Sequence, residues 1–419
     1  MNILIKNAVI LDADTQWHNK KANIHIVDGV IKAIGDTAGD SGSQIIEGED
    51  IYVSPGWFDI GASLTDPGNE HLDTVQTLSA SAAKGGFTGL AVFPRTKPKA
   101  DNKSVIISIL DKAHGEAVDI YPVGNITVDA NGKDLAEMID MYKHGAVAFS
   151  DGCQSLAHAG VMSRALLYTA GMPTYIINRP EDMSITESGI VNEGKISVML
   201  GVKGRPALAE MIMLMRDIYL CDYNNSKMIT HTISTAGAVK LVKEAKRKKI
   251  NVKATVSFHN LVENEEALKD FDAGHKVLPP LRTRQDVNAL IRGLRDGTID
   301  AIVSNHRQVD IEDKRKAFFD AEYGAISLEY MFALLNTKLA SKLPLDLIIE
   351  KISNKPREIL GLPTVHIEEG KNANITVFSP SQEWNFTEKD IKSKSKNTPY
   401  INTTLKGKVL AVINNGKMI

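Results

Sequence analysis

Several residue types that mark specialised protein classes are scarce in this chain. Of its 419 residues only two are cysteines, Cys153 and Cys221, too few for the disulfide framework of a small secreted protein and typical of a reducing cytoplasm. No uncharged run approaches the roughly 20 residues that cross a bilayer. The N-terminus lacks a basic stretch followed by a long apolar one, so no signal peptide is expected. We therefore expect a cytoplasmic protein that does not act at a membrane.

Neither sign of charge is in large excess. Lysine and arginine total 49, aspartate and glutamate total 51, and the formal net charge is −2. A chain this close to neutrality offers no electrostatic footprint for nucleic acid. With 43% hydrophobic and 24% charged residues, the composition is that of an ordinary globular protein. The length fits two or three domains, or one barrel with an appendage.

Paired histidines are also missing. None of the 11 histidines has another histidine two or four positions away. Such pairs place two imidazoles on the same side of a strand or a helix, where they hold zinc together. The sequence therefore lacks the local signature of many catalytic zinc sites.

Both ends of the chain are expected to form strands. Apolar and polar residues alternate in short segments there, and the segments are separated by turn-forming residues. We predict that residues 1–52 and 366–419 meet as a small composite β-sandwich. The candidate strands are Asn2–Leu11, Ala22–Val27, Val30–Ile34, Ala373–Phe378 and Val409–Asn414.

Between these ends, strand patterns alternate with helical ones. Helical periodicity covers, for example, Asp134–Lys143, Pro206–Cys221 and Ala236–Lys249. Eight apolar strands alternating with helices are typical of a (β/α)₈ TIM barrel, an α/β fold that we predict for residues 53–365 and that carries its functional residues at the C-terminal strand ends. The candidate barrel strands are Gly56–Ile60, Gly89–Phe93, Asp119–Val123, Ala146–Ser150, Pro173–Ile177, Lys227–Thr232, Asn251–Val256 and Asp300–Ser304.

A series of short motifs in the chain resembles those of one enzyme family, in the same order. The first is a frame, from Pro55-Gly56 to Pro67-Gly68, that contains His-x-His in dihydroorotases and related cyclic amidohydrolases. The sequence resembles dihydroorotase over nearly its whole length, which implies an amidohydrolase-type barrel but not by itself an activity. Further matching motifs are Gly85-Gly86-Phe87-Thr88, Phe149-Ser150-Asp151, Asn192-Glu193-Gly194, Gly204-Arg205-Pro206, Ser234-Thr235, Pro279-Pro280-Leu281-Arg282 and Asn397-Thr398-Pro399.

The resemblance implies a two-zinc site, most of which this chain lacks. In the family, histidines and aspartates hold zinc ions that polarise the substrate and activate water, and an aspartate moves the proton. Here glycine and serine replace the paired histidines, arginine replaces a further histidine, and asparagine, which cannot take up a proton at neutral pH, replaces the catalytic aspartate. We expect no metal; if any is bound, Asp151 and His231 are the ligands that remain. The six remnant metal-site positions are Gly61, Ser63, Asp151, Arg179, His231 and Asn305.

The positions that the resemblance assigns to the substrate have changed as well. The arginine and asparagine that would hold the carboxylate of dihydroorotate are Thr65 and Arg95 here. The asparagine that precedes Pro-Pro-Leu-Arg is Leu278. His306 keeps the family's residue type, and we expect it to be structural, like His259.

Asp151 presents an electrostatic problem. A carboxylate at a barrel mouth, in a place suited to divalent cations, needs a replacement cation or a raised pKa. We hypothesise that Arg179 fills the former metal space and pairs with Asp151, with Arg95 and Arg307 adding positive charge nearby. The reason is that three family positions have become arginine, all of them predicted at the same rim.

Three functions fit these observations. The first is a dihydroorotase-like protein of pyrimidine biosynthesis that is catalytically inactive and supports the assembly of aspartate transcarbamoylase, a role that the resemblance implies for degenerate relatives; its partner is the transcarbamoylase or a second copy of the chain. The second is an active dihydroorotase, or another cyclic-amide hydrolase, with a mononuclear metal site built from Asp151, His231 and His306. The third is a protein that binds an anionic metabolite in an arginine-lined mouth.

Overall fold

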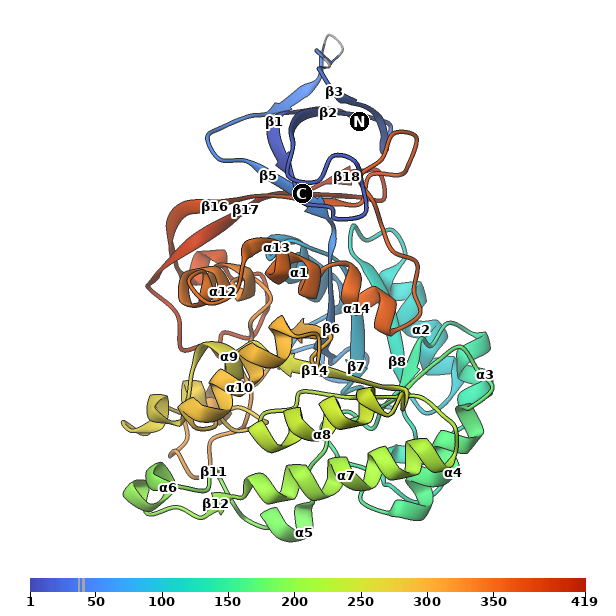
Figure 1. The fold of residues 1–419 in the computed structure, drawn as a ribbon, viewed down its shortest axis with the longest axis vertical. Coiled ribbons are helices and arrows are strands. Elements are labelled where there is room, and N and C mark those ends of the chain that lie inside the picture. The colour runs from blue at the N-terminus through green and yellow to red at the C-terminus, as the bar shows by residue number, and fades with distance from the viewer. Residues whose placement is uncertain (37, 40–41) are drawn as a thin grey trace.

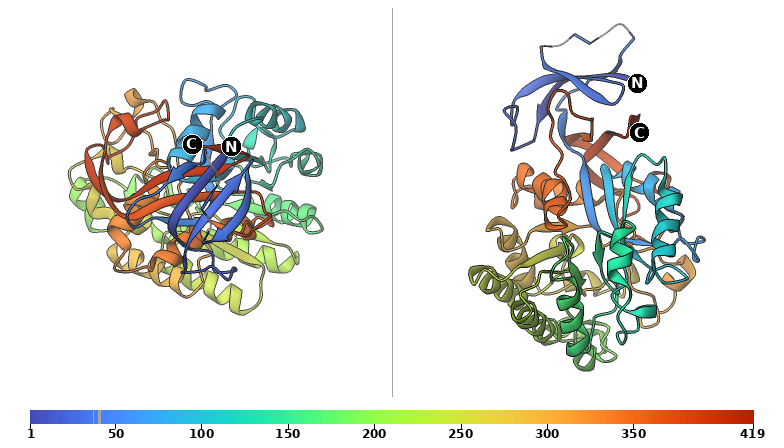
Figure 2. Two further views of the ribbon diagram at one scale, coloured as in Figure 1. Left: turned by 90° about the horizontal axis from the view of Figure 1, so that it is seen from above. Right: turned by 90° about the vertical axis from the view of Figure 1, so that its right-hand side faces the viewer.

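The computed structural model describes residues 1–36, 38–39 and 42–419. It consists of a barrel of parallel strands surrounded by helices, with a β-sheet from the two chain ends stacked on one end of the barrel (Figure 1). Seen from above, this sheet lies across the barrel and contains both termini (Figure 2). The predicted fold class, a TIM barrel with a β-unit composed of both chain ends, is therefore confirmed.

Eight strands form the barrel, and neighbouring strands follow one another in chain order. They correspond one for one to the eight predicted strands, although several are shorter. One example is β13, which ends at Thr230 because Thr232 adopts a positive φ of 55° and turns the chain away. The bounds are β6 Trp57–Leu64, β7 Phe87–Pro94, β8 Asp119–Gly124, β9 Ala148–Phe149, β10 Ile176–Asn178, β13 Met228–Thr230, β14 Val252–Ser257 and β15 Ala301–Val303.

Burial explains why these segments are continuously apolar. Every residue of β6 and β7 is buried, because one face of a barrel strand packs in the interior and the other packs against helices. Phe58, Ile60 and Val303 belong to one apolar cluster to which most of the barrel strands contribute. The interior is thus a packed core, and any site must lie at its rim.

The first and last strands, β6 and β15, meet at a seam that a buried carboxylate closes. Asp59 accepts hydrogen bonds from the backbone nitrogen of Ser304 (2.7 Å) and from its Oγ (2.5 Å). Next to this contact, Ser63 N donates to His306 O (2.9 Å). Burial raises the pKa of Asp59 to about 6. One ionisable side chain therefore ties the end of β15 to β6.

The helices between the strands begin at side-chain caps. Thr235 Oγ1 accepts from the backbone at the start of α8, and Thr283 forms a reciprocal capping box with Asp286 at the start of α10. The helix predicted over Asp134–Lys143 begins only at Met138, because the backbone before it bonds to residues 126–128 instead. Within the described residues, no helix has the length and apolar character needed to cross a bilayer. The helices are α1 Val75–Lys84, α2 Lys103–Ala113, α3 Met138–Lys143, α4 Ala159–Thr169, α5 Met183–Thr186, α6 Lys195–Leu200, α7 Ala207–Tyr223, α8 Ala236–Arg247, α9 His259–Val262, α10 Arg284–Arg295, α11 Ile311–Lys314, α12 Met331–Leu339, α13 Leu345–Ile352 and α14 Asn354–Ile359.

The two chain ends join in one sheet of order β18-β17-β16-β5-β1-β2-β3, with β4 beside β1. The junction is the antiparallel pair of β5 and β16, which sets Tyr52 opposite Phe378. The exact boundaries between this sheet and the barrel stay predictions. The strands are β1 Asn2–Ile10, β2 Lys21–Val27, β3 Val30–Gly35, β4 Gln44–Ile46, β5 Tyr52–Pro55, β16 Ile375–Phe386, β17 Thr403–Asn414 and β18 Lys417–Met418, and a separate small pair is β11 Val191–Asn192 and β12 Gly204–Arg205.

Asp59 makes the stability of the barrel seam depend on pH. Its pKa lies at about 6 in the folded protein and at the ordinary 3.8 otherwise, so the folded state holds the proton more tightly. The stability that the protonated form contributes is fully present below about pH 4 and is lost as the pH rises through about 6. In Asp59→Asn this titration is absent. Urea denaturation gives the free energy of unfolding of wild type and of Asp59→Asn. We expect the difference, wild type minus variant, to fall by about 2 to 3 kcal/mol between about pH 4 and 7. A difference that is constant or rises over this range contradicts the assignment.

Candidate functional site

A small cavity opens at the C-terminal ends of the barrel strands, where this fold places its chemistry. Its volume is about 40 Å³, which is room for one or two water molecules and is far below the roughly 300–1,000 Å³ of ordinary ligand pockets. The residues that line it are Gly61, Ser63, Phe93, Gly152, Cys153, Arg179, His231, Thr232, Leu278, Asn305, Arg307, Tyr323 and Gly324.

The structure brings six of the ten predicted site positions together in this cavity. They come from β6 and from the segments that follow other barrel strands. The other four positions, Thr65, Arg95, Asp151 and His306, do not line it. The six that do are Gly61, Ser63, Arg179, His231, Leu278 and Asn305.

Backbone packs against Gly61 so closely that no side chain fits there. A Cβ atom on Gly61 would lie 2.9 Å from Asn305 N and 3.0 Å from Val303 Cβ, which is closer than atoms approach in a packed interior. Two residues along, the backbone oxygen of Ser63 accepts from Gln308 Nε2 (3.0 Å). A histidine at position 61 would therefore require β15 and the segment after it to move.

Arg179 reaches the cavity, and its ion pair is with Glu181. Its Nη2 lies 3.0 Å from Glu181 Oε2. The other oxygen of Glu181 accepts from Arg205 Nε (2.9 Å) and lies 2.7 Å from Nη2 of the same residue. All three side chains are buried. Burial by itself would raise the pKa of Glu181, but the two guanidinium groups outweigh burial and lower it. Glu181 is therefore an ionised counter-ion shared by two arginines.

Asp151 does not pair with Arg179, so that part of our hypothesis is wrong. Its Oδ1 accepts from the backbone nitrogens of Ile126 (2.9 Å) and Thr127 (3.0 Å), and its Oδ2 accepts from Thr127 Oγ1 (2.6 Å). The segment after β8 thus satisfies the carboxylate without a cation. Burial also raises the pKa of Asp151, which is the alternative that the sequence left open.

His231 lines the cavity as a neutral imidazole. Its Nδ1 lies 3.1 Å from Thr255 Oγ1, and its ring packs on Phe93 with the centroids 4.7 Å apart. Burial, reinforced by the positive charge of Arg179, lowers its pKa to about 3. A guanidinium group only donates hydrogen bonds, so Arg179 cannot complete a set of metal ligands with His231.

His306 and His259 are both buried, and their structural role stays a prediction. His306 Nδ1 accepts from the backbone nitrogens of Ser327 (2.9 Å) and Leu328 (3.2 Å). His259 stacks on Phe258 with ring centroids 4.0 Å apart. Burial is the main reason why the pKa of each histidine falls to about 3. His306 therefore fixes the segment after β15 and does not face the cavity.

The positions that the resemblance assigns to the substrate donate hydrogen bonds to backbone carbonyl groups. Thr65 Oγ1 donates to a carbonyl just before α1 (3.0 Å). Arg95 Nη1 donates to Gln308 O (2.7 Å), and Asn305 Nδ2 donates to Leu278 O (2.9 Å). The first bond lies within the loop between β6 and α1, and the other two each join two separate loops. These side chains therefore do not form the arginine–asparagine clamp that the resemblance implies for a carboxylate.

Cys153 is a cavity residue that the sequence patterns do not single out. Arg307 Nη1 donates to its Sγ (2.7 Å). Burial raises the pKa of this thiol, but Arg307, Arg179 and Arg95 outweigh burial and bring it below its ordinary value. Burial and Arg307 also lower the pKa of Arg95 to about 10, so the guanidinium groups crowd one another. Its place in the sequence could have indicated this cavity residue, because Cys153 follows Asp151 in the loop after a barrel strand.

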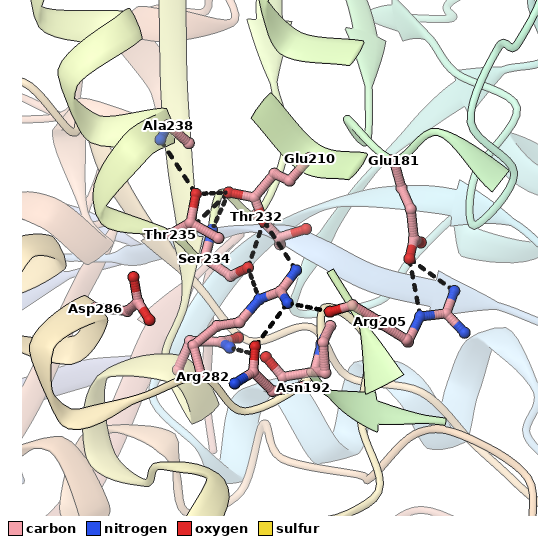
Figure 3. A network of polar contacts seen from close by, with 12 residues as sticks. Glu181, Asn192, Arg205, Glu210, Thr232, Ser234, Thr235, Ala238, Arg282 and Asp286 are labelled. Carbon is pink, nitrogen blue, oxygen red and sulfur yellow. Dashed lines mark hydrogen bonds and ion pairs between the residues drawn. The ribbon is translucent and has the colours of Figure 1, made fainter. Parts of the chain in front are cut away.

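A second buried network holds the loops around the cavity (Figure 3). Arg282 Nη1 donates to Asn192 Oδ1 (2.9 Å) and to Arg205 O (2.7 Å), and Arg282 Nη2 lies 3.8 Å from Glu210 Oε2. Glu210 in turn accepts from Thr235 N (3.0 Å) and Oγ1 (2.9 Å) at the start of α8. Arg282 thus links β11, β12, α7 and α8.

The cavity wall carries two side chains of the kinds that bind zinc, His231 and Cys153, fewer than the three protein ligands of a catalytic zinc site. Zinc in proteins is bound by thiolates, imidazoles and carboxylates, whereas the carboxylate of Asp151 is turned to Thr127 and a guanidinium group occupies the wall beside His231. Among the described residues, the one group of three such side chains that converges is Asp12, Asp14 and His366. That group lies near the N-terminal end of β6, away from the cavity. The residues at the barrel mouth therefore do not fit the metal that the resemblance implies.

Comparison with known proteins identifies the family. Residues 51–237 match the family described as dihydro-orotase-like, and residues 185–419 match the amidohydrolase family. A dihydroorotase from Pelotomaculum thermopropionicum is 37% identical over 422 residues, covering 100% of this chain and 98% of the relative. The chain belongs to the dihydroorotase family. A dihydroorotase from Syntrophus aciditrophicus is 35% identical over 423 residues and is covered to 99%.

Solved structures share the fold at lower identity. L-hydantoinase (dihydropyrimidinase) from Arthrobacter aurescens has a TM-score of 0.87 and 20% identity, with 100% of this chain and 96% of that chain covered. Dihydropyrimidinase from Brevibacillus agri has a TM-score of 0.83 and 20% identity, with coverage of 100% and 95%. At this identity the likeness establishes the barrel and its appended sheet.

The tight packing at Gly61 predicts a large effect for the smallest side chain. Gly61→Ala places a methyl group against Asn305 and Val303, and we expect this overpacking to lower the free energy of unfolding by about 1 to 3 kcal/mol. Ser63→Ala, on the same strand, removes a hydroxyl group and is the control, with an expected change below about 1 kcal/mol. Urea denaturation measures both. A Gly61→Ala variant as stable as wild type would show that β15 yields and leaves room for a ligand.

The two cysteines are expected to differ in reactivity. Arginines outweigh burial at Cys153 and lower its pKa, whereas burial raises the pKa of Cys221 to about 12. We expect iodoacetamide to alkylate Cys153 first, with a half-maximal rate below the ordinary thiol value of about pH 8.5, as measured by mass spectrometry over a pH series. Arg307→Met is expected to move this midpoint upward. An unchanged midpoint in that variant would rule out Arg307 as the cause.

Proposed function

We propose that this member of the family does not hydrolyse cyclic amides with zinc and serves as a structural partner of aspartate transcarbamoylase. Full-length similarity to proteins named dihydroorotase supports a place in pyrimidine biosynthesis.

The observation that carries the loss of zinc chemistry is the position of Arg179. Its guanidinium group lines the cavity beside His231 and is held there by Glu181. A guanidinium group stays charged at any accessible pH and repels a divalent cation. A metal at this place would have to displace a buried ion pair, whose disruption costs on the order of 3–5 kcal/mol.

The proton-transfer group and the room for a substrate have changed as well. Asn305, at the position of the catalytic aspartate, donates to Leu278 O (2.9 Å) and has no basic site at neutral pH. The cavity of about 40 Å³ is much smaller than the roughly 300 Å³ at the lower end of ligand pockets. Both features support a protein that does not turn over dihydroorotate.

A mononuclear site made of Asp151, His231 and His306 has less support. Both oxygens of Asp151 accept hydrogen bonds from the segment after β8, and His306 Nδ1 accepts from two backbone nitrogens. Of the three side chains only His231 lines the cavity. Assembling them around one ion would require three separate loops to rearrange.

A role in assembly is supported by what the chain retains. The barrel and the appended sheet are complete, and the chain covers almost the full length of its relatives. The barrel and its appended sheet are therefore available for docking, whatever the cavity does. Selection for folding and docking without catalysis produces this combination, because function resides in sites that a fold carries.

Binding of a small anion in the cavity is a second candidate function. Arg179 and Arg307 line it, and their charge, together with that of Arg95, acts on Cys153. Arginines in a desolvated site favour anions, and the volume of about 40 Å³ limits them to a few atoms. A rise in thermal midpoint with bicarbonate that disappears in Arg307→Met supports this function, and no response in the wild type excludes bicarbonate.

Metal content and hydrolysis test the proposed loss of activity together. We expect the protein, produced with added zinc, to contain well below one zinc ion per chain at the barrel mouth and to show no dihydroorotate hydrolysis. The relative from Pelotomaculum thermopropionicum, which is named dihydroorotase, is prepared in the same way as the positive control. Stoichiometric zinc that is lost in His231→Ala, together with turnover, would overturn the proposal.

Co-production with aspartate transcarbamoylase of the same organism tests the assembly role. We expect the two chains to elute together on size exclusion, and the transcarbamoylase to be less stable and less active when this chain is omitted. Cys153→Ser, a change confined to the cavity, is the control and is expected to leave co-elution unchanged. A transcarbamoylase that assembles and works equally well alone would contradict this role.

A further inference from the structure

The cavity at the barrel mouth contains a sulfur atom that the proposed function does not use. Cys153 is partly exposed and lines the cavity. Arg307 Nη1 donates a hydrogen bond to its Sγ (2.7 Å). A hydrogen bond from a guanidinium group stabilises negative charge on sulfur, and a negatively charged sulfur is the form of cysteine that attacks electrophiles. Cys153 therefore presents a nucleophile to a small space.

Two buried hydrogen-bond donors of the same cavity lack an acceptor. Arg179 is 8% exposed, and its Nε is buried without a hydrogen-bond partner in the described part of the chain. The Nε of Arg307 is buried and unpartnered in the same way. Both side chains line the cavity. A buried N–H group that makes no hydrogen bond costs free energy, so these donors point to a guest molecule that brings an acceptor.

The size of the cavity restricts that guest to very few atoms. A volume of about 40 Å³ has room for one or two water molecules. Hydrogen peroxide, with two oxygen atoms, is of this size, and both of its oxygens accept hydrogen bonds. Its O–O bond is also the electrophile that converts a cysteine into a sulfenic acid. Chloride or bicarbonate could satisfy the donors but would not react with the sulfur.

The cavity wall favours a reaction in which charge develops. Phe93 and Leu278 contribute apolar side chains to it, beside the guanidinium groups of Arg179 and Arg307. In such a poorly solvated place, fixed donors stabilise a developing negative charge more strongly than water does. The donors are held in position before any reaction, since Glu181 pairs with Arg179 (3.0 Å).

We propose that Cys153 reacts with hydrogen peroxide in this cavity, where Arg179 and Arg307 hold the peroxide, and that the product is a sulfenic acid. The sulfur attacks the nearer oxygen, so an S–O bond forms while the O–O bond breaks. The other oxygen leaves as hydroxide and combines with the proton of the thiol to give water. Sulfur loses two electrons and the peroxide gains them. The guanidinium donors stabilise the negative charge on the leaving oxygen.

The sulfenic acid has no second cysteine with which to form a disulfide. The chain contains one other cysteine, Cys221. Its thiol is buried in α7, donates to Ser226 O (3.3 Å) and does not line the cavity. The oxidised form of Cys153 therefore persists until a thiol from solution reduces it or more peroxide oxidises it further. Because the step uses this chain alone, the proposal can fail while the proposals about zinc and aspartate transcarbamoylase stand.

Trapping with dimedone, which labels sulfenic acids, tests the reaction on the full chain. One equivalent of hydrogen peroxide is added, and mass spectrometry follows the labelling of each cysteine. We expect Cys153 to be labelled at least about tenfold faster than Cys221. Arg307→Met is expected to slow the labelling of Cys153 on the order of 100-fold, as the loss of one fixed donor does. The control is Arg315→Met, which removes an exposed arginine outside the cavity and is expected to leave the rate unchanged.

A bulky hydroperoxide distinguishes the cavity from an ordinary reactive thiol. tert-Butyl hydroperoxide carries the same O–O bond on a group that a cavity of about 40 Å³ excludes. Each rate is divided by the rate of free cysteine with the same oxidant. We expect wild type to prefer hydrogen peroxide by at least about tenfold on this scale. Leu278→Ala widens the cavity and keeps the backbone oxygen that accepts from Asn305, so we expect it to narrow the preference.

Three results would overturn the proposal. The first is a wild type in which Cys153 is not labelled, and the second is an Arg307→Met variant that is labelled as fast as wild type. The third is a wild type with the same preference as free cysteine. The first and third measurements use wild type alone, so they do not depend on the folding of any variant.

Discussion

The mouth of this barrel depends on one buried carboxylate, that of Glu181. It lies between the guanidinium groups of Arg179 and Arg205, and removing one member of such a buried set costs on the order of 3–5 kcal/mol, because a charge is left without its counter-ion. The backbone oxygen of Arg205 also accepts from Arg282, which reaches Glu210. A metal site draws loops together through shared ligands; here alternating charges connect the same loops (Figure 3).

This chain of charges explains which motifs the sequence shares with its family. Asn192, Thr235 and Arg282 each belong to a motif that resembles the dihydroorotases, and each contributes a hydrogen bond to the network. Positions that depart from the family, Arg179 and Asn305 among them, face the cavity. The residues in the shared motifs therefore hold the loops in place, whereas the residues of the cavity wall determine which chemistry the site can perform. For this reason full-length similarity establishes the fold with much more certainty than the reaction.

The fold could be predicted because two independent patterns agree: eight apolar strands that alternate with helices, and family motifs in the same order. The gathering of strand ends in one cavity follows from the barrel. The ion-pair partner of Arg179 could not be predicted in this way, because pairing between side chains of loops follows no sequence period. In the structure Arg179 pairs with Glu181, and Thr127 binds Asp151. The sequence also does not reveal that the apolar outer face of α7 is exposed. A helix that is apolar on two sides gives a pattern that does not show which side is covered.

The network at the mouth also determines how α7 is held. Glu210 lies in the first turn of α7 on its buried side, where it accepts from Thr235 N and lies 3.8 Å from Arg282 Nη2. Loops that admit a substrate must open, and segments that open easily have low local stability. A mouth filled by ion pairs and packed backbone has few groups that are free to open, so its loops are expected to be locally stable. The same contacts that close the cavity therefore hold α7, whose outer side exposes Leu208, Met215, Tyr219 and Tyr223.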